Sequence, residues 1–425
     1  MLPSLEYRKN NLLDNRFDIL YTAAYSRNYT TNVATASHNY NWRGEQDLRH
    51  LVSGEQVLLH SQAINDNFNT SLNLAYRLAP SHRLTLNGLY QTSSRHNRNL
   101  LLANAPKEAA DKRSHKIVAG LSYRFKPSKR WEATAFAKYY RIGASGEVET
   151  AENSGVWQKQ SQSSENLGFG IATSYFILPS LQAKLSYERA TRLPSVNELF
   201  GDEDLETAAL TLRPERSHNL NFSLSFDKHF GKHALSAEAG IVYRNTQDYI
   251  MRNIIALPAN RGFNASHLNY GRVLTQGINA SVGYAFGKWA SLDMRFTYMN
   301  IRDNEPYMFG TTLPNIAKGA RMPNTPYFFT DTQLSLSYPD LFSTGDMLSL
   351  HYDLPFVEAF PLYSERIGRQ NGTFEVPRQM AHNLSLTYSM KEGRYNLSFE
   401  AKNLGNARLY DNYSLEKPGR AFYIK

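Results

Sequence analysis

The chain has 425 residues, is 41% hydrophobic and 12% aromatic, and contains no cysteine. Abundant aromatic residues disfavour intrinsic disorder, the lack of apolar runs of about 20 residues disfavours a helical membrane protein, and the lack of cysteine excludes disulfide frameworks and thiolate metal sites. The formal net charge of +9, from 47 basic and 38 acidic residues, is scattered along the chain and does not indicate nucleic-acid binding.

Apolar and polar residues alternate with a period of two along most of the chain, which predicts strands with one apolar and one polar face. In chain order, strands are expected at 17–26, 31–41 and 62–78, followed by 14 more that end with 419–425. About 17 strands result. In the segment 220–226, for example, Leu and Phe alternate with Asn and Ser.

The connections between the expected strands alternate between short and long. Short connections are expected at 79–81, 126–130, 179–180, 227–233, 287–288, 339–346 and 391–394. Long ones are expected at 92–114, 142–165, 190–216, 247–271, 301–327, 354–381 and 402–418. Pro and Gly set the tight dihedral angles of the short ones.

Antiparallel two-faced strands, with short turns at one end and long loops at the other, predict an all-β fold, an antiparallel transmembrane β-barrel. The hydrocarbon core of a membrane requires the sheet to close into a barrel, because each backbone polar group there must pair internally. The alternative is a soluble β protein, either a propeller or packed sandwiches. A propeller would repeat a blade motif about every 40 to 50 residues, and no such motif recurs.

Both ends of the chain suggest an incomplete barrel. Residues 1–15 have no apolar signal-peptide core. The last expected strand has seven residues, whereas a spanning strand needs about 9 to 11. Single-chain bacterial barrels also have even strand numbers, whereas about 17 strands are expected here. We therefore expect residues 1–425 to form a barrel that is incomplete at both ends.

Two segments resemble the signatures of TonB-dependent outer-membrane receptors: RLPSVNELFG at 192–201 with LRPERSHNLNFSL at 212–224, and NLGNARLYDNYSLEKPGRAFY at 403–423. We expect ion pairs among Arg192, Glu198, Arg213 and Glu215 to fix loop geometry, and so a structural role rather than ligand contact. The motif residues are Arg192, Pro194, Glu198, Phe200, Gly201, Pro214, Glu215, Asn403, Tyr410, Asp411, Asn412, Pro418, Gly419 and Arg420.

The resemblance implies a 22-stranded barrel around a plug domain, with about five strands, the plug, the TonB-contacting segment and a signal peptide upstream of Met1. Residues 1–425 would then be the C-terminal barrel part. Two features depart from the family: 208–211 lacks the usual Asn-Pro, and Lys425 stands where an aromatic residue is usual.

The function implied by the resemblance is TonB-dependent active uptake of a siderophore–iron complex, haem, cobalamin or a glycan across a Gram-negative outer membrane. The alternative is a passive, porin-like channel. The implied partners are outer-membrane lipid and lipopolysaccharide, TonB through the missing plug region, and a small-molecule or metal-chelate ligand. We expect a monomeric barrel and no nucleic-acid partner.

No phosphate-binding loop, zinc pair or nucleophile elbow occurs, so we expect no enzyme activity, no cofactor and no resident metal. His229 and His233 are four residues apart, a spacing that suits a metal-binding pair on a helix. They flank an expected turn between strands, however, so the spacing does not indicate a metal site. Six bases are expected on the inner face, where they either pair with neighbouring strands and the plug or attract anionic cargo: Arg77, Arg124, Lys138, Lys184, Arg244 and Arg295.

Five loop residues are candidates for ligand binding: His267, Tyr307, Met308, Phe309 and Arg321. The loop 304–327 mixes aromatic, Met and basic residues, a composition that suits a bulky ligand. The alternative is that its aromatic residues anchor the loop at the membrane rim, and that His267 is merely solvated.

Overall fold

The computed structural model describes residues 3–34, 59–99, 111–149, 157–201, 206–256, 263–308, 311–363, 375–412 and 415–425. The elements are β1 Ser4–Asn11, α1 Leu12–Asn15, β2 Phe17–Ala34, β3 Leu59–Ala79, β4 His82–Asn99, β5 Lys112–Phe125, β6 Trp131–Glu149, β7 Trp157–Leu178, β8 Leu181–Arg192, α2 Val196–Phe200, β9 Glu215–Phe230, β10 His233–Ala256, β11 Phe263–Phe286, β12 Ala290–Asp303, β13 Phe328–Pro339, β14 Met347–Val357, β15 Phe360–Pro361, β16 Glu375–Val376, β17 Gln379–Met380, β18 Asn383–Met390, β19 Tyr395–Lys402 and β20 Ala421–Ile424.

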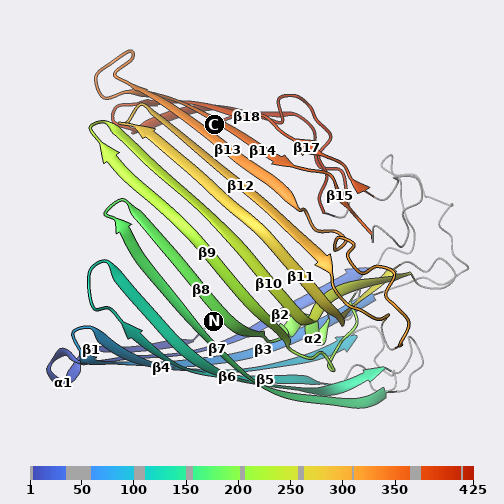
Figure 1. The fold of residues 1–425 in the computed structure, drawn as a ribbon. Coiled ribbons are helices and arrows are strands. Elements are labelled where there is room, and N and C mark those ends of the chain that lie inside the picture. Colours follow the sequence, from blue (N-terminus) through green and yellow to red (C-terminus); the bar gives the residue numbers. More distant parts are fainter. Residues whose placement is uncertain are drawn as a thin grey trace, which may run out of the picture.

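Eighteen strands form one antiparallel sheet in which nearly every strand pairs with its neighbours in sequence, and β15 and β16 form a small separate pair. The sheet curls so that the N-terminal strands lie opposite the C-terminal ones (Figure 1). Among the described residues, β1 pairs only with β2 and β20 only with β19, so the sheet is not closed. The expected all-β antiparallel barrel of about 17 strands is thus confirmed.

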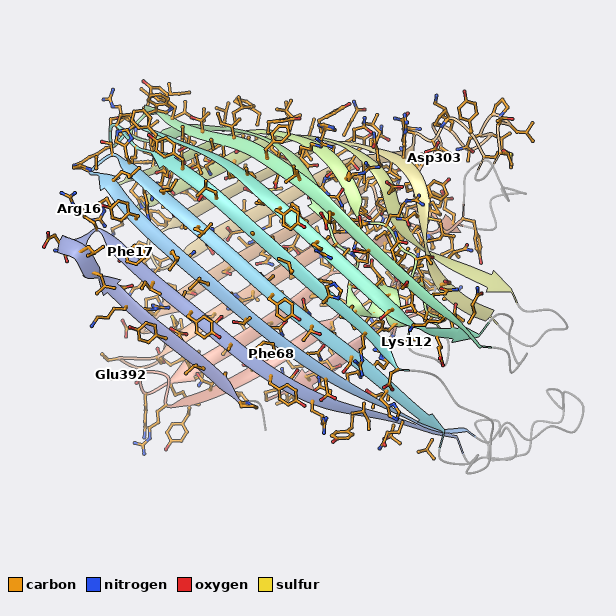
Figure 2. All side chains as sticks on the ribbon, turned by 90° about the horizontal axis from the view of Figure 1, so that it is seen from below. Arg16, Phe17, Phe68, Lys112, Asp303 and Glu392 are labelled. Atoms are coloured by element: carbon orange, nitrogen blue, oxygen red, sulfur yellow. The ribbon has the colours of Figure 1, made fainter. Side chains whose placement is uncertain are left out.

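The two ends of the sheet differ in their connections. We call one the turn end, because it carries the short connections 12–16, 80–81, 126–130, 179–180, 231–232, 287–289, 340–346 and 391–394. The opposite end, with the longer connections, is the loop end. Arg16 and Glu392 lie at the turn end, whereas Lys112 and Asp303 lie at the loop end (Figure 2). The expected sorting of connections by length is therefore present.

The strands present an apolar outward face and a polar inward face. Large apolar side chains on the outward face remain uncovered: Leu167, Ile241 and Ile278 are 67%, 58% and 55% exposed. On the inward face, Lys138 Nζ lies 2.9 Å from Glu188 Oε1. Such exposure of apolar surface is typical of a wall that meets lipid.

Aromatic rings gather on the outward face near the turn end. Phe125 and Trp131 lie 5.6 Å apart in an edge-on arrangement, and Phe286 and Trp289 lie 5.2 Å apart, between ring centroids. Tyr284 shares a hydrogen bond of 2.7 Å with a ring nitrogen of His233. Amphipathic rings at one level of the wall fit a membrane–water interface. No helix of the described residues is long and apolar enough to cross a membrane.

Three expectations about strand bounds were wrong. Residues 4–11, for which no strand was expected, form β1. Residues 17–34 form a single strand rather than parts of two, and 35–41 lie outside the described residues. The expected loops 92–114, 142–165 and 247–271 are shorter, because the strands that flank them continue toward the loop end. Those extensions carry no regular alternation of large apolar residues, so the pattern did not mark them as strands.

We predict that a charge on the outward face destabilises the protein far more than the same charge on the inward face. Ile278→Arg places a guanidinium in the apolar layer and should lower the free energy of unfolding in lipid vesicles by about 2–4 kcal/mol. Asn279→Arg, one residue along β11 on the inward face, is the matched control and should cost much less. Urea titration in vesicles measures both; equal losses would contradict the two-faced wall.

Candidate functional site at the loop end

The first structured feature of the loop end is the short helix α2 after β8. Ser195 caps it in a reciprocal capping box: Glu198 N donates to Ser195 Oγ at 3.2 Å, and Ser195 N donates to Glu198 Oε2 at 2.7 Å. The Ser-x-x-Glu spacing in the sequence is the reason for this cap. It fixes the direction in which the chain leaves β8.

Arg192 joins α2 to the next strand. Its guanidinium lies 3.0 Å from Glu198 Oε1 and 2.8 Å from Glu215 Oε1. Glu215 also accepts a hydrogen bond of 2.8 Å from Ile250 N on β10. Burial alone would raise the pKa of Glu198, but the Ser195 backbone N–H and the Arg192 guanidinium hold that pKa below its usual range. Three strands and α2 therefore meet at one charge-assisted network.

The segment between β8 and β9 also buries an apolar cluster on the inward side. Leu199, Phe200 and Leu210 are at most 1% exposed and pack with Ile142 of β6 and Ile250 of β10. The Arg95 guanidinium lies 5.7 Å from the centroid of the Phe200 ring and donates to the carbonyl of Gly201.

The three small or rigid motif residues in this segment have steric roles. Pro194 and Pro214 are buried. Gly201 has φ 67°, and a Cβ there would meet the carbonyl oxygen of Glu206. This position therefore favours glycine.

Arg213, the fourth charged residue expected in the Arg192 network, pairs elsewhere. Its Nη2 lies 2.7 Å from Asp248 Oδ1, and Arg216 Nη2 lies 2.8 Å from Asp248 Oδ2. Asp248 has φ 54° at an irregularity in β10. Asn269 Nδ2 donates to the carbonyl oxygens of both Arg213 and Asp248 at 2.9 Å. The sequence did not single out Asp248, because an acid in an extended loop carries no spacing signal.

A third network holds the loop 304–327. Asp303, 3% exposed, accepts hydrogen bonds from Tyr270 Oη at 2.6 Å and from Asn315 Nδ2 at 2.9 Å. Burial and the hydrogen bond to Asp303 raise the pKa of Tyr270. Arg272 N donates to Glu305 Oε2 at 2.9 Å. Asp303 was also missed in the sequence, since it ends a strand without a motif.

The C-terminal motif residues order the connection between β19 and β20. Asn403, 3% exposed, bonds through its side chain to both backbone groups of Ala407, at 2.8 and 2.9 Å. Tyr410 N donates to Gln379 Oε1 at 2.6 Å, and Leu415 N donates to Asp411 Oδ1 at 3.0 Å. Pro418 and Gly419 lead into β20, and Arg420 N donates to Asn406 Oδ1 at 3.0 Å. Asn412 is exposed.

The candidate ligand-binding residues do not form one site. Tyr307 and Met308 line a groove of about 810 Å³ together with Arg213, Arg216 and Arg272. Arg321 lies elsewhere, with its guanidinium 3.5 Å from the centroid of the Tyr327 ring. Tyr327 in turn packs edge-on against Tyr298, on the outward face of β12. Phe309 lies outside the described residues.

His267, the fifth candidate, lies apart from the groove. It stands opposite Arg252 in the β10–β11 ladder. Arg252 shares a strand face with Ile250, whose side chain belongs to the inward apolar cluster, so His267 also faces inward. Its Nδ1 is buried without a hydrogen-bond partner among the described residues.

The inward wall is polar, and four of its basic side chains have partners within it. Arg124 lies 2.6 Å from Glu132, and Lys184 Nζ is 3.2 Å from Ser225 Oγ. Arg244 Nε bonds Asn219 at 3.0 Å and Arg77 bonds the Asn15 carbonyl at 3.1 Å. Two shallow recesses of about 360 and 380 Å³ lie on this wall, the second lined in part by Arg295. In the described segments, no three His, Asp or Glu residues are placed to hold a metal.

The comparisons with known proteins agree with this architecture. The family model described as TonB dependent receptor-like, beta-barrel matches residues 3–404. The solved structure of the copper transporter OprC is similar, with a TM-score of 0.71 and 13% identity over all of this chain and 64% of that one. A search of curated protein sequences gave no match.

Two further solved structures show the same fold. The ferric yersiniabactin uptake receptor FyuA from Yersinia pestis has a TM-score of 0.66 and 11% identity, over all of this chain and 58% of that one. The ferric citrate transporter FecA has a TM-score of 0.67 and 13% identity, over all of this chain and 60% of that one. The chain thus spans about six tenths of the length of these proteins.

We predict that Arg192→Ala loosens the segment 193–214. The side chains of Glu198 and Glu215 are only 17% and 12% exposed, so both lose their cation in a poorly hydrated place. A local cost of about 1–3 kcal/mol follows. Hydrogen exchange of these amides should accelerate, while that of the turn end stays unchanged. Arg189→Ala, on the outward face of the same strand, is the control; equal protection in both variants would contradict the network's role.

The same protection should depend on pH. The pKa of Glu198 is lowered in the folded protein, so its stabilising contribution is complete above the usual value of about 4.3 and is lost as the pH falls through the lower folded value. The protection factors at α2, which correct for the pH dependence of intrinsic exchange, should therefore fall over that acidic range. Glu198→Gln should remove most of this pH dependence. If the pH dependence remains in this variant, a group other than Glu198 is responsible for it.

Proposed function

The chain belongs to the family of TonB-dependent receptor β-barrels, and from that premise we propose that it forms the barrel wall of an outer-membrane receptor for active uptake of a large, scarce nutrient. Barrels of this family lie in the outer membrane of Gram-negative bacteria, and we propose the same location for this protein. TonB, acting through a plug domain inside the barrel, would supply the energy. The cargo would be a siderophore–iron complex, haem, cobalamin or a glycan.

The observation that carries this proposal is the two-faced sheet with all its long connections at one end. An apolar outward face suits lipid, and a polar inward face suits water or a polar domain. Several inward charges neutralise one another within the wall, as in the pairs Arg124–Glu132 and Lys138–Glu188. This favours a wall against which another polar body packs over a strongly charged, ion-selective pore.

The cargo class draws support from proteins of similar fold. Their names describe a copper transporter, a ferric yersiniabactin uptake receptor and a ferric citrate transporter. We propose a metal ion or metal chelate as the first cargo to test.

Within the barrel mouth, His267 is the candidate that faces the cargo. It lies on the inward face near the loop end, and its buried Nδ1 makes no hydrogen bond to a described residue. Tyr307, Met308 and Arg321 lie with outward-facing groups instead. We therefore assign these three to anchoring of the loop at the membrane rim, and only His267 to ligand contact.

We predict that deletion of the gene slows growth on one limiting nutrient of these classes, and that loss of TonB has the same effect on that nutrient. A strain carrying His267→Ala should need a roughly tenfold higher concentration of it, whereas one carrying Tyr307→Ala should grow as the wild type does. Growth and uptake of the labelled nutrient are the measurements. Uptake that persists without TonB would indicate a passive channel and would contradict the proposal.

A further inference from the structure

The connection between β8 and β9 runs across the inside of the sheet at the loop end. We call its described parts, residues 193–201 and 206–214, the brace. The brace begins at β8 and ends at β9, but its contacts reach from β4 to β11. These two strands are seven steps apart in the order of the sheet. At about 4.8 Å per step, they are about 34 Å apart along the wall.

The first part of the brace is held by β4. Arg95 lies on the face of β4 opposite to the exposed Leu86, and so points inward. Its guanidinium donates to the carbonyl oxygen of Gly201 and lies 5.7 Å from the centroid of the Phe200 ring. Asn65 of β3 orients this guanidinium, because its Oδ1 accepts from Arg95 Nε at 2.7 Å. Arg95 is 8% exposed, so water does not compete for these contacts.

The second part of the brace is held by β10 and β11. Glu206 Oε1 lies 2.5 Å from Arg252 Nε of β10. Thr207 N donates to the carbonyl oxygen of Ala265 at 2.9 Å, and Glu206 forms an isolated parallel bridge with Ala265. Since Arg252 stands opposite His267 in the ladder, this end of the brace lies beside the residue that we assign to cargo contact.

Between these two ends, apolar packing anchors the brace. Leu199 and Phe200 from its first part and Leu210 from its second are at most 1% exposed, in one cluster with side chains of β6 and β10. The two parts are also joined directly, because Ala209 N donates to the carbonyl oxygen of Leu199 at 2.9 Å. Lifting the brace from the wall would expose three large apolar side chains to water, which opposes such a motion.

This burial distinguishes the brace from another long connection at the loop end. In the loop 304–327, Tyr307, Leu313 and Ile316 are 54%, 61% and 58% exposed. That loop follows β12 without burying these side chains, whereas the brace buries its large apolar residues against distant strands. Close attachment to the inward wall is therefore a property of this connection rather than of the loop end in general.

We propose that the brace is a fixed support of the barrel mouth, which holds β4 at a constant distance from β10 and β11 and stays in place while cargo passes. At the loop end the strands extend beyond the apolar layer, so lipid no longer confines them and the ladder alone would allow the wall to bend. Because the brace joins strands seven steps apart, it makes this part of the wall rigid. The mouth beside His267 then keeps one shape, and cargo binding requires no closure of this connection.

The distance between β4 and β11 tests the brace without transport. Spin labels on Ser94→Cys and Leu268→Cys report this distance in the purified protein in lipid vesicles, since the chain has no cysteine of its own. Both positions lie on the outward face, next to the inward Arg95 and His267. Pulsed electron paramagnetic resonance should give one narrow distance distribution. Arg252→Gln should widen it roughly twofold, because Glu206 then loses its charged partner at the β10 end.

Lys138→Gln is the matched control, because it removes an inward ion pair, to Glu188, that joins strands only two steps apart. Glu206→Gln removes the brace ion pair from its other side, and serves if the Arg252 variant does not fold. A wider distribution in the brace variants, with the wild-type distribution in the Lys138 variant, supports the proposal. Equal distributions in all proteins overturn it, since the ladder alone would then fix the mouth. Widening in the Lys138 variant as well also overturns it.

A covalent lock tests whether the brace stays in place during uptake, and this second test rests on the function proposed above. Bridge partners lie about 4.8 Å apart, within the Cα separation that a disulfide spans, so Glu206→Cys/Ala265→Cys should form one. The oxidised variant should take up labelled nutrient at the rate of the control Glu206→Ser/Ala265→Ser. Uptake that is lost on oxidation and restored by reduction would overturn the proposal. If the wild type itself takes up nothing, the uptake proposal fails, and the distance measurement still decides the role of the brace.

Discussion

Backbone hydrogen bonding is the constraint on which the rest of this structure depends. Inside hydrocarbon, an N–H or C=O group without an internal partner costs several kcal/mol. A continuous antiparallel ladder satisfies these groups, and eighteen strands of this chain form one. Since side chains alternate across a strand, each strand must then combine two chemistries, one for lipid and one for the polar interior.

Where the strands leave the apolar layer, ionic networks take over from lipid in fixing the chain. Arg192, Asp248 and Asp303 each collect several partners at a strand end or irregularity. Each joins segments that are distant in sequence, so the loop end is held without a large apolar core.

The sequence predicted most of the fold, because alternation and connection length both follow directly from a two-faced wall. It failed where that signal ends. The extensions of β6, β7, β10 and β11 toward the loop end lack a regular alternation of large apolar residues, and so they were predicted as loops. The charged strand β1 was missed because lysine, arginine and asparagine mask the alternation of Leu5 and Tyr7.

The loop end could be predicted only in part. The motif around Arg192 predicted ion pairs that fix the local structure, and the structure places Arg192 on Glu198 and Glu215. The predicted ion-pair partners of Arg213 were wrong, because Asp248 comes close to it only through the irregularity in β10. The side on which Tyr307 and Met308 lie could not be inferred either, since loop residues carry no strand parity.

The central claim, that one strand face meets lipid and the other meets water, can be tested directly because the chain has no cysteine. Single cysteines would be placed at each position from Leu220 to Phe226 of β9, and labelled in outer membranes with a membrane-impermeant maleimide after the membranes are opened. We predict strong labelling at positions 221, 223 and 225 and weak labelling at 220, 222, 224 and 226. Uniform labelling along the strand would contradict the account.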